Sequence, residues 1–248
     1  MGTRPHDTLE TRTTIAVAAL AVGLAALGAL GVGSGDFAFQ WQPVPPDVPA
    51  RGGLAVAAGL LEIAAAGLLA FARLRAAGAG LAAALLLVWT ALHVPAVVQR
   101  PASIADWLGV AESAAMASAA LMFAAGNEAI RRACTLVFGL AAIVFGASHF
   151  AYADFTASMI PGWLPQRVAL AYFTGAAHAL AGIAIVTGLW RVLAASLEAL
   201  MMASFVVLVH VPRVIAHPDS RMEWTMLFVA LTLGGSAALV AALSRRRA

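Results

Sequence analysis

Six ionisable side chains lie in or beside strongly apolar stretches of the sequence, and they are the candidates for chemistry. They are two glutamates and four histidines, namely Glu62, Glu112, His93, His149, His178 and His210. A charge left alone in the hydrocarbon of a bilayer costs a few kcal/mol, so such residues turn inward and pair with one another or serve a function. Histidine exchanges protons near neutral pH because its ordinary pKa is about 6.5. The six residues are therefore candidates for binding a ligand or exchanging protons.

The composition indicates where these residues must sit. Of the 248 residues 62% are hydrophobic and only 11% are charged, with a mean hydropathy of +0.90. A chain with so little polar side chain cannot cover a water-soluble globule of this size, so the expected partner is the lipid bilayer. A net charge of +3, scattered along the chain, argues against a nucleic-acid surface. The single cysteine, Cys134, excludes a disulfide within one chain and is interpreted as a small buried side chain.

Eight apolar segments are long enough to cross about 30 Å of hydrocarbon as helices of about 20 residues. They are Thr14–Val32, Leu54–Leu74, Ala77–Val98, Ile104–Ala125, Ala133–Tyr152, Val168–Trp190, Val192–Ile215 and Trp224–Leu243. None alternates with a period of two, so the sequence predicts an all-α polytopic membrane protein rather than a β-barrel. The first segment resembles a signal peptide in position. Its length and the acids Asp7 and Glu10 before it favour a retained helix.

The arginines predict the orientation. With eight spans they gather at one end of the helices, where the chain holds Arg4, Arg12, Arg73, Arg75, Arg131, Arg132, Arg191 and Arg245 to Arg247. Positive residues concentrate on the cytoplasmic side, so we expect both termini in the cytoplasm. An odd number of spans would place either the N-terminal or the C-terminal arginines on the outer side of the membrane.

An internal repeat divides the chain into two four-helix units. HVPAVVQRPASIADW begins at His93 and HVPRVIAHPDSRMEW begins at His210, at an offset of 210 − 93 = 117. Upstream, at offsets that differ by a single gap, Phe39 pairs with Phe155, Pro49 with Pro165 and Gly59 with Gly175. We define residues 1–126 as the first unit and 127–248 as the second unit. Each contains an even number of spans, which predicts a pseudo-twofold axis along the membrane normal.

The second unit resembles a known family. Residues 146–188 read GASHFAYADFTASMIPGWLPQRVALAYFTGAAHALAGIAIVTG. This stretch is similar to the core signature of DoxX-like membrane proteins, in which a helix ends in His-Phe, here His149-Phe150. An acidic-aromatic loop follows, then a Pro-x-x-Leu-Pro turn, and the next helix opens with a Tyr-x-x-Gly-x-x-Glu pattern.

The chain departs from that pattern at two positions. His178 stands where the family has its helix glutamate, whereas the first unit keeps Glu62 but has Gly33-Ser34 in place of His-Phe. Family members are single four-helix units, so the chain resembles a tandem duplication. The resemblance implies a bacterial inner-membrane protein that is redox-associated, some relatives being subunits linked to quinol oxidation. It implies no particular activity, and an accessory subunit of a membrane oxidoreductase is favoured over an enzyme.

Residue depth predicts one shared site. At 1.5 Å of rise per residue, Glu62, His93, Glu112, His178 and His210 lie roughly 5 to 20 Å inside the outer boundary. We expect four of them, Glu62, His93, His178 and His210, to line one polar cavity open to the outer face. Glu112 would lie near this cavity and His149 at its mouth. Glu198 and Trp89 are interpreted as structural: a carboxylate near the cytoplasmic helix end and a packing ring.

Three classes of function remain open at this point. The first is a redox-associated module that binds a quinone or another lipophilic ligand in the outer half of the bundle, with histidine and glutamate exchanging protons with it. The second is a proton-coupled small-molecule transporter, and the third is a haem or metal protein, which no metal-ligand spacing supports. A partner-binding membrane subunit without a ligand is the structural alternative. In that case the repeated His-Val-Pro would only satisfy carbonyls that the prolines leave unpaired.

Overall fold

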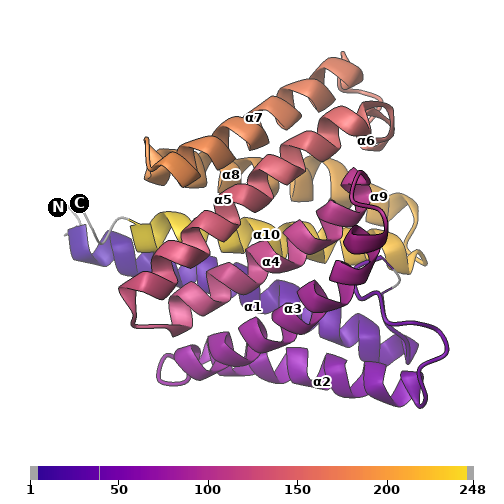
Figure 1. Ribbon diagram of the computed structural model, residues 1–248, viewed down its shortest axis with the longest axis vertical. Coiled ribbons are helices and arrows are strands. Elements are labelled where there is room, and N and C mark those ends of the chain that lie inside the picture. Colours follow the sequence, from indigo (N-terminus) through magenta and orange to yellow (C-terminus); the bar gives the residue numbers. More distant parts are fainter. Residues whose placement is uncertain (1–4, 39, 245–248) are drawn as a thin grey trace.

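The computed structural model describes residues 5–38 and 40–244, and all regular structure in these residues is helical (Figure 1). The elements are α1 (Pro5–Ser34), α2 (Arg51–Ala70), α3 (Arg75–Gln99), α4 (Ile104–Ala124), α5 (Glu128–Ala151), α6 (Ala153–Met159), α7 (Arg167–Thr187), α8 (Arg191–Phe205), the π-helix η1 (Val206–His210), α9 (Val211–Ala216) and α10 (Arg221–Ser244). Arg4, Phe39 and the arginines 245 to 247, used in the sequence argument, lie outside the described residues.

Eight stretches of the described chain are long and apolar enough to cross a membrane, which confirms the predicted fold class. Seven of them lie within α1, α2, α3, α4, α5, α7 and α10, and the eighth runs through α8, η1 and α9 as Arg191–Ala216. The second and sixth predicted spans, Leu54–Leu74 and Val168–Trp190, are too long, because α2 ends at Ala70 and α7 at Thr187. Helix α7 ends at Thr187 because Gly188 takes the left-handed conformation, with φ of 84°.

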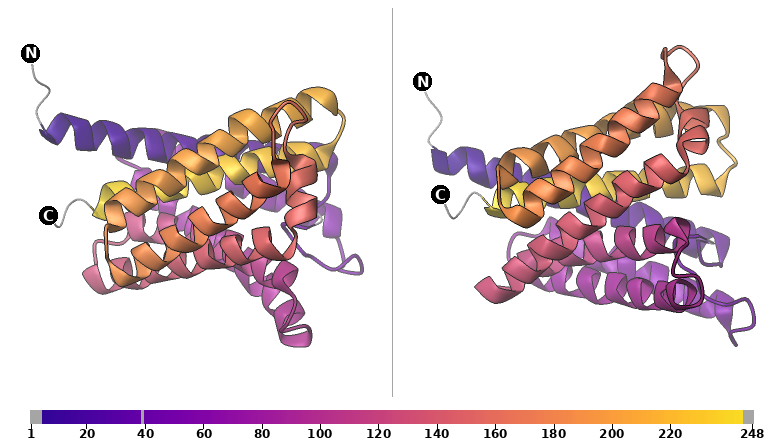
Figure 2. Two further views of the ribbon diagram at one scale, coloured as in Figure 1. Left: turned by 90° about the horizontal axis from the view of Figure 1, so that it is seen from above. Right: turned by 45° about the horizontal axis from the view of Figure 1, so that its top comes forward.

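The helices form a closed ring of neighbours, and two members of this ring, α4 and α10, also pack against each other at its centre. Helix α1 packs against α2 and α10, α3 against α2 and α4, α5 against α4 and α7, and α8 against α7 and α10. Figures 1 and 2 show that α1 begins and α10 ends at the same end of the molecule. We call this the short-loop end, and we call the other the long-loop end, because it holds the loops 35–50 and 152–166.

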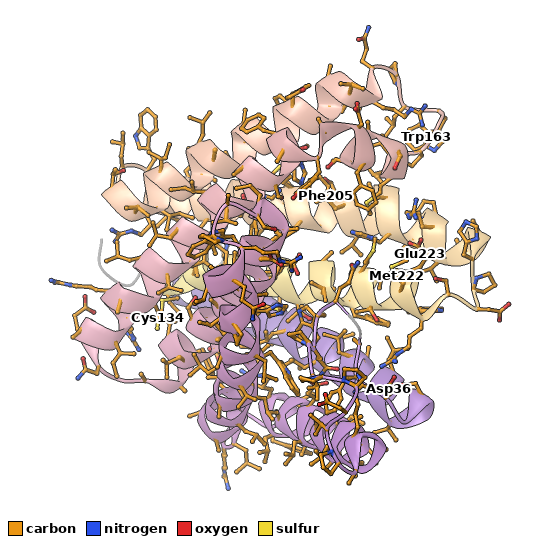
Figure 3. The ribbon with its side chains drawn as sticks, turned by 45° about the vertical axis from the view of Figure 1, so that its right-hand side comes forward. Asp36, Cys134, Trp163, Phe205, Met222 and Glu223 are labelled. Carbon is orange, nitrogen blue, oxygen red and sulfur yellow. The ribbon has the colours of Figure 1, made fainter. Side chains whose placement is uncertain are left out.

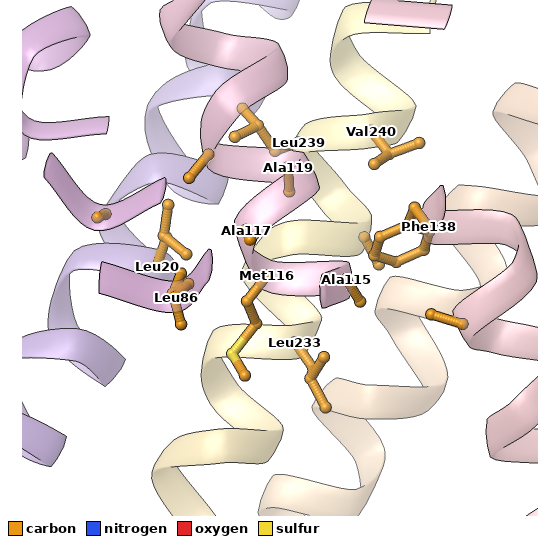
Figure 4. Packing of buried hydrophobic residues seen from close by; sticks show 14 of the residues in the cluster. Leu20, Leu86, Ala115, Met116, Ala117, Ala119, Phe138, Leu233, Leu239 and Val240 are labelled. Carbon is orange, nitrogen blue, oxygen red and sulfur yellow. The ribbon is translucent and has the colours of Figure 1, made fainter. Parts of the chain in front are cut away.

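The centre of the bundle is packed with small and unbranched apolar side chains. Ala115, Met116 and Ala119 of α4 meet Leu233 and Leu239 of α10 in this core, all at most 4% exposed (Figure 4). Alanine at these positions lets the helix backbones approach closely. In lipid this close packing drives helix association, because lipid tails are as apolar as the side chains and no hydrophobic effect operates between helices. The core therefore joins the two units along α4 and α10.

Several local contacts occur once in each unit. The indole Nε1 of Trp107 donates to the Pro101 carbonyl at 2.9 Å, and Trp224 makes the same bond to Pro218 at 2.8 Å. At the short-loop end, a guanidinium Nε of each unit donates to a carbonyl six residues earlier, Arg75 to Leu69 at 3.3 Å and Arg191 to Ile185 at 3.2 Å. The sequence repeat is thus accompanied by repeated local structure.

The π-helix η1 explains a one-residue irregularity in the repeat. Arg75 and Arg191 are 116 residues apart, whereas His93 and His210 are 117 apart. The second unit therefore carries one extra residue in this helix. A π-helix accommodates an added residue inside an α-helix, and η1, Val206–His210, lies within that interval. The third helix of the first unit, α3, is α-helical through the same interval.

Candidate functional site

Glycine-lined crossings set the position of the buried ionisable residue in each unit. A Cβ on Gly59 of α2 would lie 2.5 Å from the Gly28 carbonyl of α1, and one on Gly146 of α5 would lie 2.6 Å from the Gly175 carbonyl of α7. These distances are too short for a real Cβ, so only glycine allows the helices to cross this closely. Glu62 and His178 follow their glycines by three residues and point inward, each 1% exposed.

In the second unit, His178 is paired with Glu198 of α8. Its Nδ1 lies 2.7 Å from Oε1 of Glu198, and the two side chains are 1% and 0% exposed. The other carboxyl oxygen of Glu198, Oε2, is buried and has no hydrogen-bond partner. A histidine nitrogen and a carboxyl oxygen at this distance are joined by a hydrogen bond, which offsets part of the cost of burying both groups in the apolar interior.

Aromatic rings surround this pair on the side of the long-loop end. The His149 ring lies edge-on to the His178 ring at 5.0 Å and stacks against Phe205 at 6.0 Å. His149 Nδ1 also lies 2.9 Å from the Thr174 hydroxyl. His149 and Phe205 are only half-buried, so they separate the fully buried pair from the surroundings. Figure 3 shows Phe205 inside the second unit and Trp163 projecting at its long-loop end.

In the first unit, one carboxyl oxygen of Glu62 accepts hydrogen bonds from two neutral donors. Gln42 Nε2 and Trp89 Nε1 both donate to its Oε1, at 3.0 and 3.1 Å, while Oε2 is buried without a partner. The Phe37 ring packs edge-on against Trp89 at 5.8 Å. The residues Phe37, Trp41 and Gln42 of the α1–α2 loop are all at most 5% exposed, and we call them the loop plug.

The loop plug also holds His93. The Trp41 carbonyl lies 3.3 Å from His93 Nε2, and since a carbonyl can only accept, this nitrogen carries the hydrogen. The ring rests against Gly109, where a Cβ would lie 2.4 Å from it. The network of the first unit is therefore closed over by its own chain.

His210, the repeat counterpart of His93, has no such partner. It lies half-buried at the end of η1, and its buried Nδ1 has no hydrogen-bond partner. The nearest charges are those of Arg213 and Glu223, which form an ion pair at 2.5 Å. Glu223 lies toward the long-loop end in Figure 3.

Glu112 stands apart from these networks. It lies on the central helix α4, is half-buried, and forms no hydrogen bond or ion pair with any residue that the structure describes. Its counterpart in the second unit is Val229. Glu112, which we expected near the shared cavity, is thus an isolated carboxyl group among the described residues.

The expectation of one shared cavity is replaced by two separate networks. Glu62 and His93 bond only to the loop plug and to α3, whereas His178 and His149 contact α5, α7 and α8. Helix α2 packs against α1 and α3, and α7 packs against α5, α6 and α8, so the two networks belong to different helix sets. His149 does cover the site of its unit, as a residue at its mouth would.

Glu198 and Trp89, which the sequence analysis interprets as structural, are hydrogen-bond partners of His178 and Glu62. The depth of Glu198 along its helix could have indicated this partnership. It lies seven residues from the start of α8 and His178 nine residues from the end of α7, which at 1.5 Å per residue is about 10 and about 14 Å from the short-loop end. Antiparallel neighbours at that depth can meet. Gln42 and the rest of the loop plug carried no periodic signal at all.

The register of the His-Phe element also needs a correction. A Cβ on Gly175 would meet His149 Cβ at 2.9 Å and the Phe150 ring, and one on Gly59 would meet Val32 after the Gly28 carbonyl. Phe150 therefore corresponds to Val32, and His149 to Gly31 rather than to Gly33.

Cys134 is buried, as expected. No group of three metal-ligating side chains that could hold a metal ion occurs among the described residues.

The fold and the site define a polytopic helical protein of the membrane type with a buried histidine-glutamate pair. Residues 138–233, which cover most of the second unit, match a family model described as a domain of unknown function, DUF8561. No curated protein and no solved structure matches the chain.

Proposed function

We propose that this chain is a DoxX-like integral protein of the bacterial cytoplasmic membrane, acting as a redox-associated module. In this proposal the second unit binds a quinone or another lipophilic ligand near its long-loop end, which faces outward, and both termini face the cytoplasm. The arginines of the short-loop end, among them Arg73, Arg131 and Arg191, support this orientation.

The observation that carries the proposal is the pair of His178 and Glu198. Two fully buried ionisable groups, bonded at 2.7 Å, are costly to place in an apolar bundle and are retained where they are used. The buried Oε2 of Glu198 has unused hydrogen-bonding capacity, which a proton-exchanging pair needs. The half-buried rings of His149 and Phe205 above the pair offer the flat surfaces against which a ring-shaped ligand stacks.

A difference between the two units supports placing the proposed ligand in the second unit. Trp89, which corresponds to Phe205, is 4% exposed beneath the loop plug, and His93 is 7% exposed. Phe205 and His210 are both half-buried. The third helix is therefore less deeply buried at these positions in the second unit than in the first.

Identification of bound small molecules tests the proposal. The protein is purified in mild detergent, and the molecules it retains are identified by absorbance and mass spectrometry. We expect a quinone in the wild type and in Glu62→Gln, and about tenfold less in Glu198→Gln, because about 1.4 kcal/mol of lost interaction changes an equilibrium constant tenfold. Elution profile and melting temperature must be unchanged in both variants.

The other results of this experiment point to the other classes. A Soret absorbance band would indicate haem, and a protein that retains nothing would favour a partner-binding membrane subunit. A proton-coupled transporter would instead acidify or alkalinise the lumen of vesicles when a substrate gradient is applied, and His178→Ala would abolish the change. Equal quinone in the wild type and Glu198→Gln would contradict the proposed site.

A further inference from the structure

The loop between the first two long helices of each unit takes a different path in the two copies. In the first unit the loop plug turns into the bundle, with Trp41 and Gln42 at most 5% exposed. Their counterparts in the second unit, at an offset of 116, are Ala157 and Ser158. The alanine brings no ring into the bundle, and the Ser158 hydroxyl donates to the Phe155 carbonyl of its own helix at 2.6 Å. The second loop instead forms helix α6, which packs against α7.

Helix α6 turns small side chains toward the protein and a large one away from it. Ala153 and Ala157, one turn apart, are each 7% exposed, whereas Phe155 is 64% exposed. Beyond α6, Trp163 is 68% exposed and projects from the long-loop end (Figure 3). The counterpart of Trp163 in the first unit is Asp47, again at an offset of 116. The second unit therefore presents an aromatic ring where the first presents a carboxylate.

These two rings belong to a larger group of exposed aromatic side chains. The described residues include nine exposed aromatic side chains, and five of them lie at the end of α5, in α6 and its loop, or in the first two turns of α7, namely Phe150, Phe155, Trp163, Tyr172 and Phe173. Phe150 stacks against Tyr172, with 6.1 Å between the ring centroids. Phe173 lies six residues beyond Arg167, where α7 begins, which is about 9 Å along the helix. The group thus covers the level of the lipid headgroups and of the upper acyl chains.

The surroundings that suit this group of rings are lipid. Phe173 and Leu180, two turns apart on α7, are 68% and 66% exposed, so the rings continue the exposed apolar side of a candidate membrane span. Residues 155–166 contain no charged side chain. Exposed rings without charged neighbours are costly in water, whereas Trp and Tyr concentrate at the boundary between lipid and water.

We propose that α6 lies in the headgroup region of the bilayer at the long-loop end, with the rings of Phe155 and Trp163 inserted among the lipids. A helix that turns apolar side chains toward the membrane binds there through the apolar area it buries. The two copies of the loop then differ in role, because the first packs into its own unit and the second anchors its unit to the lipid. This inference does not depend on the ligand proposed for the second unit.

Fluorescence quenching in lipid nanodiscs tests the inference. In full-length Cys134→Ala protein, single cysteines at Phe155, at Trp163 and, as the matched control, at Asp47 are labelled with an environment-sensitive fluorophore. Phosphatidylcholine with a nitroxide near the top of its acyl chain should reduce the emission of the first two labels by about half, because they lie among the lipids. Aqueous iodide should quench the label at Asp47→Cys at least about threefold more strongly than the other two.

Two other results would overturn the inference. Iodide quenching at Trp163→Cys as strong as at Asp47→Cys would place the surface in water, free for a soluble partner. Protection of both loop labels from both quenchers would show that a second protein copy covers the surface.

A second measurement separates anchoring from mere location. The double variant Phe155→Ser and Trp163→Ser should keep its elution profile, because both side chains are exposed. Hydrogen exchange of the α6 amides in nanodiscs should increase about tenfold, since the helix loses its hold on the lipid. Unchanged exchange would contradict an anchoring role of the two rings.

Discussion

At the scale of the residue, the proposed chemistry rests on the histidine-glutamate pair. His178 has the same place in its unit as Glu62 has in the other, yet their partners differ in kind. Glu62 receives two hydrogen bonds from neutral side chains, those of Gln42 and Trp89. His178 instead faces a second ionisable side chain, Glu198, with 2.7 Å between Nδ1 and Oε1.

Breaking the pair should cost stability in a coupled manner. We expect His178→Ala and Glu198→Ala each to lower the free energy of unfolding by about 3 kcal/mol, because each leaves a buried ionisable group without its partner. The double variant should lose clearly less than the sum of the two. Unfolding in detergent with increasing denaturant measures all four corners of this cycle.

A second cycle provides the control. Glu62 and His178 share no hydrogen-bond partner, so Glu62→Gln and His178→Ala should be additive within about 0.5 kcal/mol. A single shared cavity would instead couple these two residues. Strong coupling between them would restore that earlier view, and additivity between His178 and Glu198 would contradict the present one.

At the scale of the element, close crossings without side chains hold each site in place. Helices α5 and α7 cross at Gly139, Gly146, Gly175 and Gly182, and the first unit repeats one such crossing at Gly28 and Gly59. These contacts place the residue three positions after the glycine against its neighbours. Glycine is needed there because of the neighbouring backbone, at a cost in helix propensity of about 1 kcal/mol relative to alanine.

Filling one of these crossings should loosen the second unit. In Gly182→Ala the new Cβ would lie 2.5 Å from the Gly139 carbonyl and 2.7 Å from Ile143 Cγ1. We expect a loss of about 2 kcal/mol in unfolding free energy from this overpacking. The matched control is Gly67→Ala in α2, where nothing lies within 4 Å of the added atom.

The control variant should behave in the opposite way. Gly67→Ala should be neutral or stabilising by up to about 1 kcal/mol, because alanine favours the helix. Hydrogen exchange of α5 and α7 should increase in Gly182→Ala alone. Equal effects of the two substitutions would show that the crossing does not depend on direct backbone contact.

At the scale of the whole molecule, the two units are joined through the central helices. Helix α4 of the first unit packs against α5 of the second, and α10 of the second packs against α1 of the first. These reciprocal contacts support the predicted relation between the units, a rotation near 180° about the membrane normal, which stays a prediction. The two halves have nevertheless diverged: the loop plug bonds to Glu62 and His93 in the first, whereas His178 pairs with Glu198 in the second.

Surface labelling should establish how the bundle lies in the membrane. After Cys134→Ala, a single cysteine is introduced at Asp47 or Asp219 of the long-loop end, or at Arg73 or Gly126 of the short-loop end. Membrane-impermeant maleimide applied to intact cells should label the first two positions and not the last two. Disruption of the membrane should make all four reactive. Labelling of Arg73→Cys in intact cells would invert the orientation.

The sequence by itself determined the class of fold and the number of spans. Apolar runs of about 20 residues have only one general solution in lipid, a helix that satisfies its own backbone, so composition and length were sufficient. The repeated His-Val-Pro segments likewise identified the two units, because identical residues at a constant offset do not depend on packing. The one-residue change in that offset was visible as well, although its structural form, the π-helix η1, was not.

The tertiary structure alone decided which of the buried residues act together. Depth along a helix was predictable from a rise of 1.5 Å per residue, but depth does not specify the direction in which a side chain points or the helix that it faces. Glu62 and His178 therefore appeared to share one site, whereas they lie in separate networks. The loop plug was equally hidden, because irregular segments carry no periodic pattern, and only the packing of α1, α2 and α3 around Trp41 and Gln42 shows that one unit is closed.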